Sequence, residues 1–335
     1  MTPRRCPVGL LRGTAQAAAV ALVVACGAPP PNAPMVRVTI PPGSTFHGIV
    51  DTLSAHDLIR SAEWFRILAR IRGVDRTVKA GIYDLPATGG AWTLLGILKE
   101  GRVATVRFTA PEGLTLLDLA DLVEERLGIP ADSFLAHAGD STLRRELNVA
   151  APTLEGYLLP ETYTLPLPVT SEALLQDMVG MFRRRWNPAW DQRLDSIGLT
   201  RHQLLTLASI VEGEARHDDE RATIAGVYTN RLKLGMLLQA DPTVQYAVEM
   251  ARGERKPRLF FKDLEIDSPY NTYLHPGLPP GPVNSPGIKS IEAALYPAPV
   301  PFLYFVADSD GHHTFSRTLE EHNQAVARRD RARGR

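Results

Sequence analysis

A ten-residue pattern occurs twice in this chain, and it limits how the N-terminal half can fold. The segments VRVTIPPGST and VRFTAPEGLT lie 70 residues apart, and Val, Arg, Thr, Pro, Gly and Thr recur in register. Each copy is typical of a strand, at Val36–Ile40 and at Val106–Ala110, that enters a Pro/Gly turn. Thr45 and Thr115 then stand where a helix N-cap is expected. The sequence therefore predicts two repeated βα units.

The order of strand, Gly-x-Thr turn and apolar helix resembles the LysM glycan-binding module. In the second copy, Leu116, Leu119, Ala120 and Val123 have the spacing of one buried helix face. A βα unit that binds no ligand would show the same pattern, so the repeat alone leaves glycan binding open. We expect a LysM-like region at residues 36–150.

The composition is that of an ordinary globular protein. The chain has 335 residues, of which 44% are hydrophobic and 22% charged, enough for two modest domains. Its formal net charge is zero, which gives no indication of general nucleic-acid binding. The two cysteines, Cys6 and Cys26, both lie in the first 26 residues. The rest of the sequence therefore has no cysteine nucleophile, cysteine–zinc site or internal disulfide.

The first 26 residues are typical of an export signal. Arg4, Arg5 and Arg12 precede the apolar run Ala15–Ala25, which is shorter than the roughly 20 residues that a spanning helix needs. Small residues then precede Cys26, as at a bacterial lipoprotein cleavage site, and residues 27–35 form a stiff proline-rich linker. A lipidated Cys26, an uncleaved membrane anchor and plain secretion are the alternatives. All three place the body of the protein outside the cytoplasm.

Beyond residue 150 the pattern changes to helices and proline-rich loops. Helices are expected from an N-cap at Ser171 to about Trp186, after an N-cap at Thr200, at Asp219–Leu234 and after an N-cap at Asp241. The segment HPGLPPGPVNSPG can only be a loop, and FLYFVADSDGHHTFS predicts two strands around an Asp-Gly turn. The expected fold class is α+β: an export or anchor segment, small LysM-like βα units, then a mixed α+β domain at residues 151–335.

Two glutamates, Glu212 and Glu214, interrupt the apolar stretch LASIVEGEA. On a helical wheel at about 100° per residue, both fall inside the apolar arc of Leu204–Ala215. They lie on opposite flanks of it, because residues i and i+2 do not face each other. A carboxyl group in apolar surroundings has a raised pKa, and a proton retained near neutral pH is what a general acid needs. The alternative is that both side chains lie in an exposed last turn of the helix.

Other signals of chemistry are weak. The sequence contains no G-x-S-x-G, no P-loop and no H-E-x-x-H motif. Glu214 stands three residues before His217, but no second E-x-x-H accompanies it, which favours a helix-end ion pair over a metal site. His312 and His313 lie beside a turn without a cysteine to complete a metal site. We expect neither a metal ion nor an organic cofactor.

Five motifs together resemble the YceG-like (MltG) endolytic murein transglycosylases. They occur in the family's order between about Val36 and Val326: LASIVEGEA, NRLKLGMLLQADPTVQYA, SPYNTYLHPGLPPGPVNSPG, AALYPA and YFVADSDGHHTFSRTLEEHNQAV. The resemblance implies a membrane-attached protein whose catalytic domain is residues 151–335. It also implies a lyase that cleaves the β-1,4 bond between N-acetylmuramic acid and N-acetylglucosamine in nascent peptidoglycan, leaves 1,6-anhydro ends and terminates glycan elongation.

The family's motif A-S-I-V-E-x-E implies that Glu212 is the catalytic acid and base, with Glu214 in a supporting position. A muramidase-type hydrolase and a non-catalytic glycan-binding protein are the alternatives. A hydrolase usually needs a second carboxylate within about 5–9.5 Å. Because the two glutamates face apart, they make a poor hydrolase pair, although Glu161 or Asp241 could supply a more distant partner.

The remaining motifs supply candidate substrate-binding residues, since polar groups on rigid loops are suited to orienting sugar hydroxyls. Structural packing is equally consistent with each of them singly. They are Gln239, Asp241, Thr243, Asn271, Tyr273, Asn284, His313 and Phe315. The expected partners are peptidoglycan strands, penicillin-binding synthases and the membrane, with no nucleic acid. The expected location is the periplasmic face of the inner membrane, with attachment through an N-terminal helix, as is usual in the family, or through lipidated Cys26.

Overall fold

The computed structural model describes residues 33–256, 258–332 and 334, and the chain forms two compact units. Unit 1 comprises the described part of Met1–Val106 together with Pro166–Pro168, and unit 2 comprises Arg107–Leu165 and Val169–Arg335. The boundary therefore follows Val106, whereas the sequence led us to expect a boundary after residue 150. The second βα unit consequently belongs to the same compact unit as the C-terminal helices.

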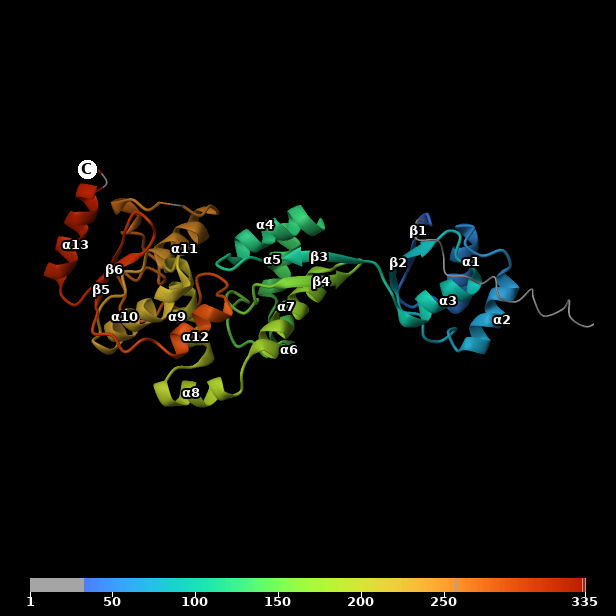
Figure 1. The fold of residues 1–335 in the computed structure, drawn as a ribbon, viewed down its shortest axis with the longest axis horizontal. Coiled ribbons are helices and arrows are strands. Elements are labelled where there is room, and N and C mark those ends of the chain that lie inside the picture. Colours follow the sequence, from blue (N-terminus) through green and yellow to red (C-terminus); the bar gives the residue numbers. More distant parts are fainter. Residues whose placement is uncertain (1–32, 257, 333, 335) are drawn as a thin grey trace, which may run out of the picture. The chain divides into compact units, whose positions relative to one another are not determined.

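Unit 1 is a two-stranded antiparallel ribbon with three helices (Figure 1). The strands pair from Met35 opposite Pro86 to Ile40 opposite Gly81. Val38 and Tyr83 are completely buried on the inner face of the ribbon, where alternate side chains of a strand point to the core. The elements are β1 (Met35–Ile40), α1 (Phe46–Ala55), α2 (Ala62–Arg72), β2 (Gly81–Pro86) and α3 (Ala91–Glu100).

Unit 2 holds most of the helices, the sheet of β5 with β6, and all of the paired strands β3 and β4 except the first two residues of β3 and the last of β4 (Figure 1). Strands β5 and β6 are antiparallel, with Tyr304 opposite Ser316 and Ala307 opposite His313. Its first elements are β3 (Thr105–Thr109), α4 (Leu116–Leu127), α5 (Ala131–Gly139), α6 (Ser141–Glu146), β4 (Thr162–Pro166), α7 (Ser171–Arg185) and α8 (Ala189–Ile197). The others are α9 (Arg201–Glu214), the 3₁₀ turn Asp218–Glu220, α10 (Arg221–Lys233), α11 (Asp241–Arg252), the 3₁₀ turn Phe261–Asp263, α12 (Ile288–Leu295), β5 (Tyr304–Ala307), β6 (His313–Ser316) and α13 (Leu319–Ala332).

Both repeated βα units form as predicted. The hydroxyl of Thr45 accepts the backbone N–H of Gly48, and the hydroxyl of Thr115 accepts that of Asp118, so each threonine caps its helix. The turn glycines Gly43 and Gly113 have φ of 76° and 78°, a conformation in which a Cβ atom would be strained. The two copies therefore share one local structure although they lie in different units.

Hydrogen bonds explain why the second βα unit belongs to unit 2. The Thr115 hydroxyl donates to the Glu249 carboxylate on α11 at 2.6 Å. In the preceding turn, Gly113 N–H donates to the Ser285 carbonyl at 2.9 Å, and Ser285 N–H donates back to the Leu114 carbonyl at 2.8 Å. The turn of the second repeat is thereby tied to the proline-rich loop that precedes α12.

Helix α9 lies at the centre of unit 2 and carries both glutamates of interest in its last turn. It packs against α8, α10, α11 and α12. All side chains from Leu204 to Val211 are buried, which is the pattern of a helix surrounded on every side by protein. Thr200 and Gln203 form a capping box that begins the helix. The last turn therefore sits on a rigid support.

The α+β fold class is confirmed, with differences at helix starts. The structure places the N-cap of α7 one residue earlier than expected, at Thr170 rather than Ser171. Helix α10 begins at Arg221 rather than Asp219, because Asp218–Glu220 form a separate 3₁₀ turn. Asp241 is the first residue of α11 rather than its N-cap, and its carboxylate instead accepts the Tyr273 hydroxyl at 2.6 Å. In the described part of the chain, no helix has both the length and the apolar character that crossing a membrane would require.

We expect the support under α9 to be sensitive to cavities. Ile210→Ala removes atoms from a side chain that is 0% exposed, and should lower the free energy of unfolding by about 2–5 kcal/mol. The matched control is Leu319→Ala on α13, where the leucine is 55% exposed, and should change it by no more than about 0.5 kcal/mol. Urea unfolding of both variants measures the difference. Equal stabilities would contradict the central position of α9.

Candidate functional site

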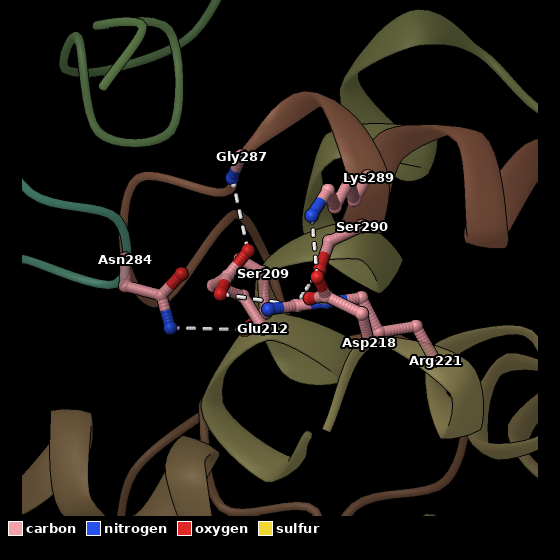
Figure 2. Close-up of polar contacts among 8 residues, drawn as sticks. All are labelled: Ser209, Glu212, Asp218, Arg221, Asn284, Gly287, Lys289 and Ser290. Carbon is pink, nitrogen blue, oxygen red and sulfur yellow. Dashed lines mark hydrogen bonds and ion pairs between the residues drawn. The ribbon is translucent and has the colours of Figure 1, made fainter. Parts of the chain in front are cut away.

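The first glutamate, Glu212, is held in a buried ion pair. One carboxylate oxygen accepts from the Arg221 guanidinium at 3.0 Å, and the other accepts from the Gly287 backbone N–H at 3.0 Å. The side chains of Glu212 and Arg221 are 7% and 9% exposed. Figure 2 shows both contacts. Each oxygen of Glu212 therefore has one donor and keeps a second lone pair.

A polar network fixes this ion pair between three segments (Figure 2). Arg221 also donates to Ser290 on α12 and to the carboxylate of Asp218, and Asp218 pairs with Lys289. The network joins the end of α9 to the starts of α10 and α12. These contacts hold the Glu212 carboxylate in a fixed position.

Glu112 is a further carboxylate in this region that the sequence did not point to. It lies in the Pro-Glu-Gly turn of the second repeat, and a Cβ atom added to Gly287 would be 1.9 Å from its carboxyl oxygen. Desolvation raises the pKa of Glu112, and the negative charge of Glu212 raises it further. A larger residue at position 287 would displace the carboxyl end of this flexible side chain.

The second glutamate, Glu214, faces the other flank of α9. The Tyr228 hydroxyl of α10 donates to its carboxylate at 2.8 Å. Desolvation, followed by the negative charge of Asp241, raises the pKa of Glu214 to about 7. The two carboxylates thus diverge as the helical wheel predicts, and the structure gives them different environments.

The glycine between the glutamates lets α11 approach α9. A Cβ atom at Gly213 would meet the ring of Pro242 at 2.7 Å, well inside van der Waals contact. Pro242 occupies the first turn of α11, where a missing N–H costs nothing. The Glu-Gly-Glu order therefore brings the start of α11, and with it Asp241, next to Glu214.

Glu214 borders a polar cavity of about 260 Å³. Four of the predicted substrate-binding residues line it: Gln239, Asp241, Tyr273 and His313. Gln239 has φ of 50°, a conformation that is uncommon outside glycine and is found at functional sites. The His313 ring nitrogen lies 2.8 Å from the Glu220 carboxylate, which fixes the imidazole at the cavity wall.

The other four predicted residues do not line this cavity. Thr243, Asn271 and Asn284 are each 0% exposed. The Asn271 amide donates to the Leu264 and Ile266 carbonyls, and the Asn284 amide donates to the Ser209 carbonyl of α9 at 2.9 Å. These side chains satisfy buried backbone groups and so hold the loops in place.

Phe315 likewise packs against Phe302, Phe305 and the His313 ring, and it is absent from the cavity lining. Its contacts therefore make it a support for His313.

Several lining residues escaped the sequence interpretation because nothing in their local pattern marks them. Tyr228 and Arg231 lie on α10 among buried apolar residues, Phe305 on β5, and Arg329 on α13. Arg231 is 8% exposed and donates to the Leu303 and Leu238 carbonyls, at 2.6 and 2.7 Å. These hydrogen bonds give Arg231 a structural role in holding the two carbonyls. The contact between Tyr228 and Glu214 joins two helices, so it is visible only in the folded chain.

The cavity has the parts that acid–base catalysis on a sugar requires. Glu214 retains a proton to about neutral pH, and Asp241 and Tyr273 form a hydrogen-bonded pair opposite it. Among residues 33–256, 258–332 and 334 there is no cluster of three or more His, Cys, Asp or Glu side chains that could hold a metal ion.

Comparison with known proteins agrees with this arrangement. The YceG-like family matches residues 38–328. An endolytic murein transglycosylase of Bacillus subtilis (strain 168) is 35% identical over 87% of this chain and 83% of its own length. One from Streptococcus pneumoniae serotype 2 (strain D39 / NCTC 7466) is 32% identical over 87% of this chain, which spans only 58% of that protein.

A crystal structure of a YceG-like protein from Listeria monocytogenes shares the fold. It has a TM-score of 0.61 and 35% sequence identity, and the alignment covers 88% of this chain and 99% of that one. The match extends over both compact units. This chain therefore belongs to the YceG-like family.

Proposed function

We propose that this protein is an endolytic murein transglycosylase, a lyase that cuts peptidoglycan glycan strands. The observation that carries the proposal is a carboxyl group with a pKa of about 7, Glu214, on the wall of a polar cavity. The curated relatives named endolytic murein transglycosylase support the substrate and the reaction. The family membership of residues 38–328 supports the same assignment.

In the proposed reaction, protonated Glu214 donates its proton to the oxygen of the β-1,4 bond between N-acetylmuramic acid and N-acetylglucosamine. The resulting carboxylate then removes the proton from the C6 hydroxyl of the muramic residue, whose oxygen bonds to C1. A 1,6-anhydro ring forms, and Glu214 is again protonated. One carboxyl group suffices because the substrate supplies the nucleophile, in contrast to hydrolysis by two carboxylates.

We assign the acid to Glu214 rather than to Glu212, which the motif alone had suggested. Both Glu212 oxygens accept hydrogen bonds from donors that are themselves fixed, Arg221 and Gly287. Glu214 accepts hydrogen bonds from the Tyr228 hydroxyl and the Asp241 backbone N–H, and it borders the cavity. A group that must release and regain a proton needs access to substrate, and Glu214 has that access.

Hydrolysis is the second candidate reaction, because Asp241 lines the same cavity as Glu214. A carboxylate at that position could activate a water molecule as a general base. Glu161 is a weaker candidate for the partner, since its carboxylate is paired with Arg185 at 2.9 Å and does not line the cavity. Hydrolysis would leave reducing ends, whereas the lytic reaction leaves 1,6-anhydro ends.

We place the protein in the cell envelope, where peptidoglycan is found. Attachment to the periplasmic face of the inner membrane, through lipidated Cys26 or an N-terminal helix, is part of the proposal. So is work beside penicillin-binding synthases during strand elongation. Cys26 lies outside the described residues, and the support for attachment is the basic, apolar and small-residue order of the first 26 positions.

Substitution of the two glutamates should separate their roles. Glu214→Gln should lower the rate of 1,6-anhydro product release by about 10²- to 10⁴-fold, because the amide cannot donate the proton. Glu212→Gln should mainly lower stability, by about 3–5 kcal/mol, because it leaves Arg221 buried without its full partner. Mass spectrometry of digested peptidoglycan measures the products, and urea unfolding measures stability.

As a control, the activity of both variants is divided by the amount of folded protein. The assay is run under conditions in which Glu212→Gln remains folded. Unchanged anhydro release from Glu214→Gln would refute its role as the acid. Reducing-end products from the unaltered protein would establish the hydrolase. Strand binding without product from any form would establish a glycan-binding protein.

The pH dependence of kcat/KM should reveal the pKa of Glu214. The acid must be protonated in the free enzyme, so activity is full below the pKa and is lost as pH rises through about 7. Above that pH, kcat/KM should fall about tenfold per unit. An unperturbed glutamate, with a pKa of about 4.3, would give an enzyme already inactive at pH 7. A fall in activity centred near pH 4 to 5 would therefore reject Glu214.

Lipidation has a separate test. In cells supplied with a radiolabelled fatty acid, Cys26→Ala should abolish incorporation of label, because the thiol that accepts the lipid is gone. Cys6→Ala is the matched control and should incorporate label as the unaltered protein does. Equal labelling of both variants would exclude Cys26 as the attachment point.

A further inference from the structure

A second cavity adjoins the catalytic one. It has a volume of about 710 Å³ and shares Asp241 and Tyr273 with the cavity that Glu214 borders. Its remaining walls come from residues 258–264, the segment that follows α11. The hydrogen-bonded pair Asp241–Tyr273 thus forms a wall common to both cavities, and a polymeric substrate could extend from one into the other.

The second cavity carries two exposed aromatic rings. Phe261 is 91% exposed and Phe260 is 57% exposed. The Arg258 guanidinium lies 5.9 Å from the centroid of the Phe260 ring. Exposing a phenylalanine forgoes the free energy of burying it, so two in succession beside an active site indicate a binding surface.

Buried polar contacts hold these rings in place. The Asp263 side chain is 0% exposed, and it accepts from Lys256 Nζ at 2.6 Å and from the Phe260 backbone N–H at 2.9 Å. The Asn271 amide fixes the other end of the segment through the Leu264 carbonyl at 2.9 Å. Phe260 and Phe261 therefore lie at the start of a 3₁₀ turn whose backbone is fixed by hydrogen bonds.

The same segment presents positive charge. Arg258 and Lys262 both line the second cavity, and neither has an ion-pair partner among the described residues. By contrast, Lys256 and Arg252 both lie close to the Asp263 carboxylate. Two cations without a carboxylate partner flank two aromatic rings, a combination suited to a ligand that is apolar on one face and acidic at its edge.

We propose that residues 258–264 form a subsite for the murein strand beyond the bond that is cut. Phe261 and Phe260 stack on the apolar C–H faces of the sugar rings, and Arg258 and Lys262 pair with the carboxylates of the stem peptides. The proposal rests on the proposed function, since it takes the substrate to be peptide-bearing glycan. The common wall of Asp241 and Tyr273 favours a strand over a lipid surface, because it continues the reaction cavity.

Binding of glycan strands to the full-length Glu214→Gln protein tests the subsite without cleavage. Adding Phe261→Ala should weaken the Kd for long strands about 5- to 10-fold, because one ring contact is lost. The matched control is Leu319→Ala, which removes a 55% exposed apolar side chain from α13 and should leave the Kd unchanged. The double substitution Arg258→Ala and Lys262→Ala should raise the Kd for strands that carry stem peptides about 2- to 5-fold. It should leave the Kd unchanged for strands whose stem peptides an amidase has removed.

Equal Kd values for Phe261→Ala and Leu319→Ala would overturn the subsite. The subsite would also be overturned if Phe261→Ala lost binding to murein-free phospholipid vesicles but bound strands as before. That result would assign the rings to a membrane surface. A Glu214→Gln protein that still releases anhydro products would refute the catalytic assignment instead. KM and kcat of Phe261→Ala and Leu319→Ala should also be measured with Glu214 intact. Loss of the subsite should change KM alone, which distinguishes a failure of the subsite proposal from a failure of the catalytic assignment.

Discussion

The buried ion pair between Glu212 and Arg221 is the interaction on which the rest of the site depends. It joins the end of α9 to the start of α10, and the Gly287 N–H brings the start of α12 to the same carboxylate. A buried carboxylate without its partner would carry a large desolvation penalty. The pair therefore fixes where the last turn of α9 lies. Glu214, two residues further on, inherits that position and faces away from the ion pair.

Two carboxylates on one helical turn thus have different environments because different segments surround them. Glu212 accepts hydrogen bonds from Arg221 and from the Gly287 backbone N–H. Glu214 meets desolvation and the charge of Asp241, and both raise its pKa toward neutrality. A carboxyl group whose pKa lies near neutrality can supply acid chemistry at physiological pH. Here a single glycine, Gly213, separates the two environments and lets Pro242 bring Asp241 close.

Much of the secondary structure could be predicted from the sequence, because residues close together in the chain determine it. Thr45, Thr115 and Thr200 cap helices where a side-chain oxygen before an apolar run predicts it. The β5–β6 hairpin follows from its Asp-Gly turn. The division into units did not follow, because it depends on long-range bonds such as that between Thr115 and Glu249, which no local pattern records. The sequence suggested one region at residues 36–150 that holds both copies of the repeat, whereas tertiary contacts assign one copy to each compact unit.

The choice between the two glutamates shows where sequence reasoning stops. The wheel correctly gives their divergence, since that is a property of one helix. It cannot say which flank receives a donor, because Arg221, Tyr228 and Gly287 come from other segments. The motif resemblance favoured Glu212 for its position in the pattern, without reference to its partners. Of the two carboxyl groups, Glu214 is desolvated and borders the polar cavity, and these two observations are the basis of its proposed role as the acid.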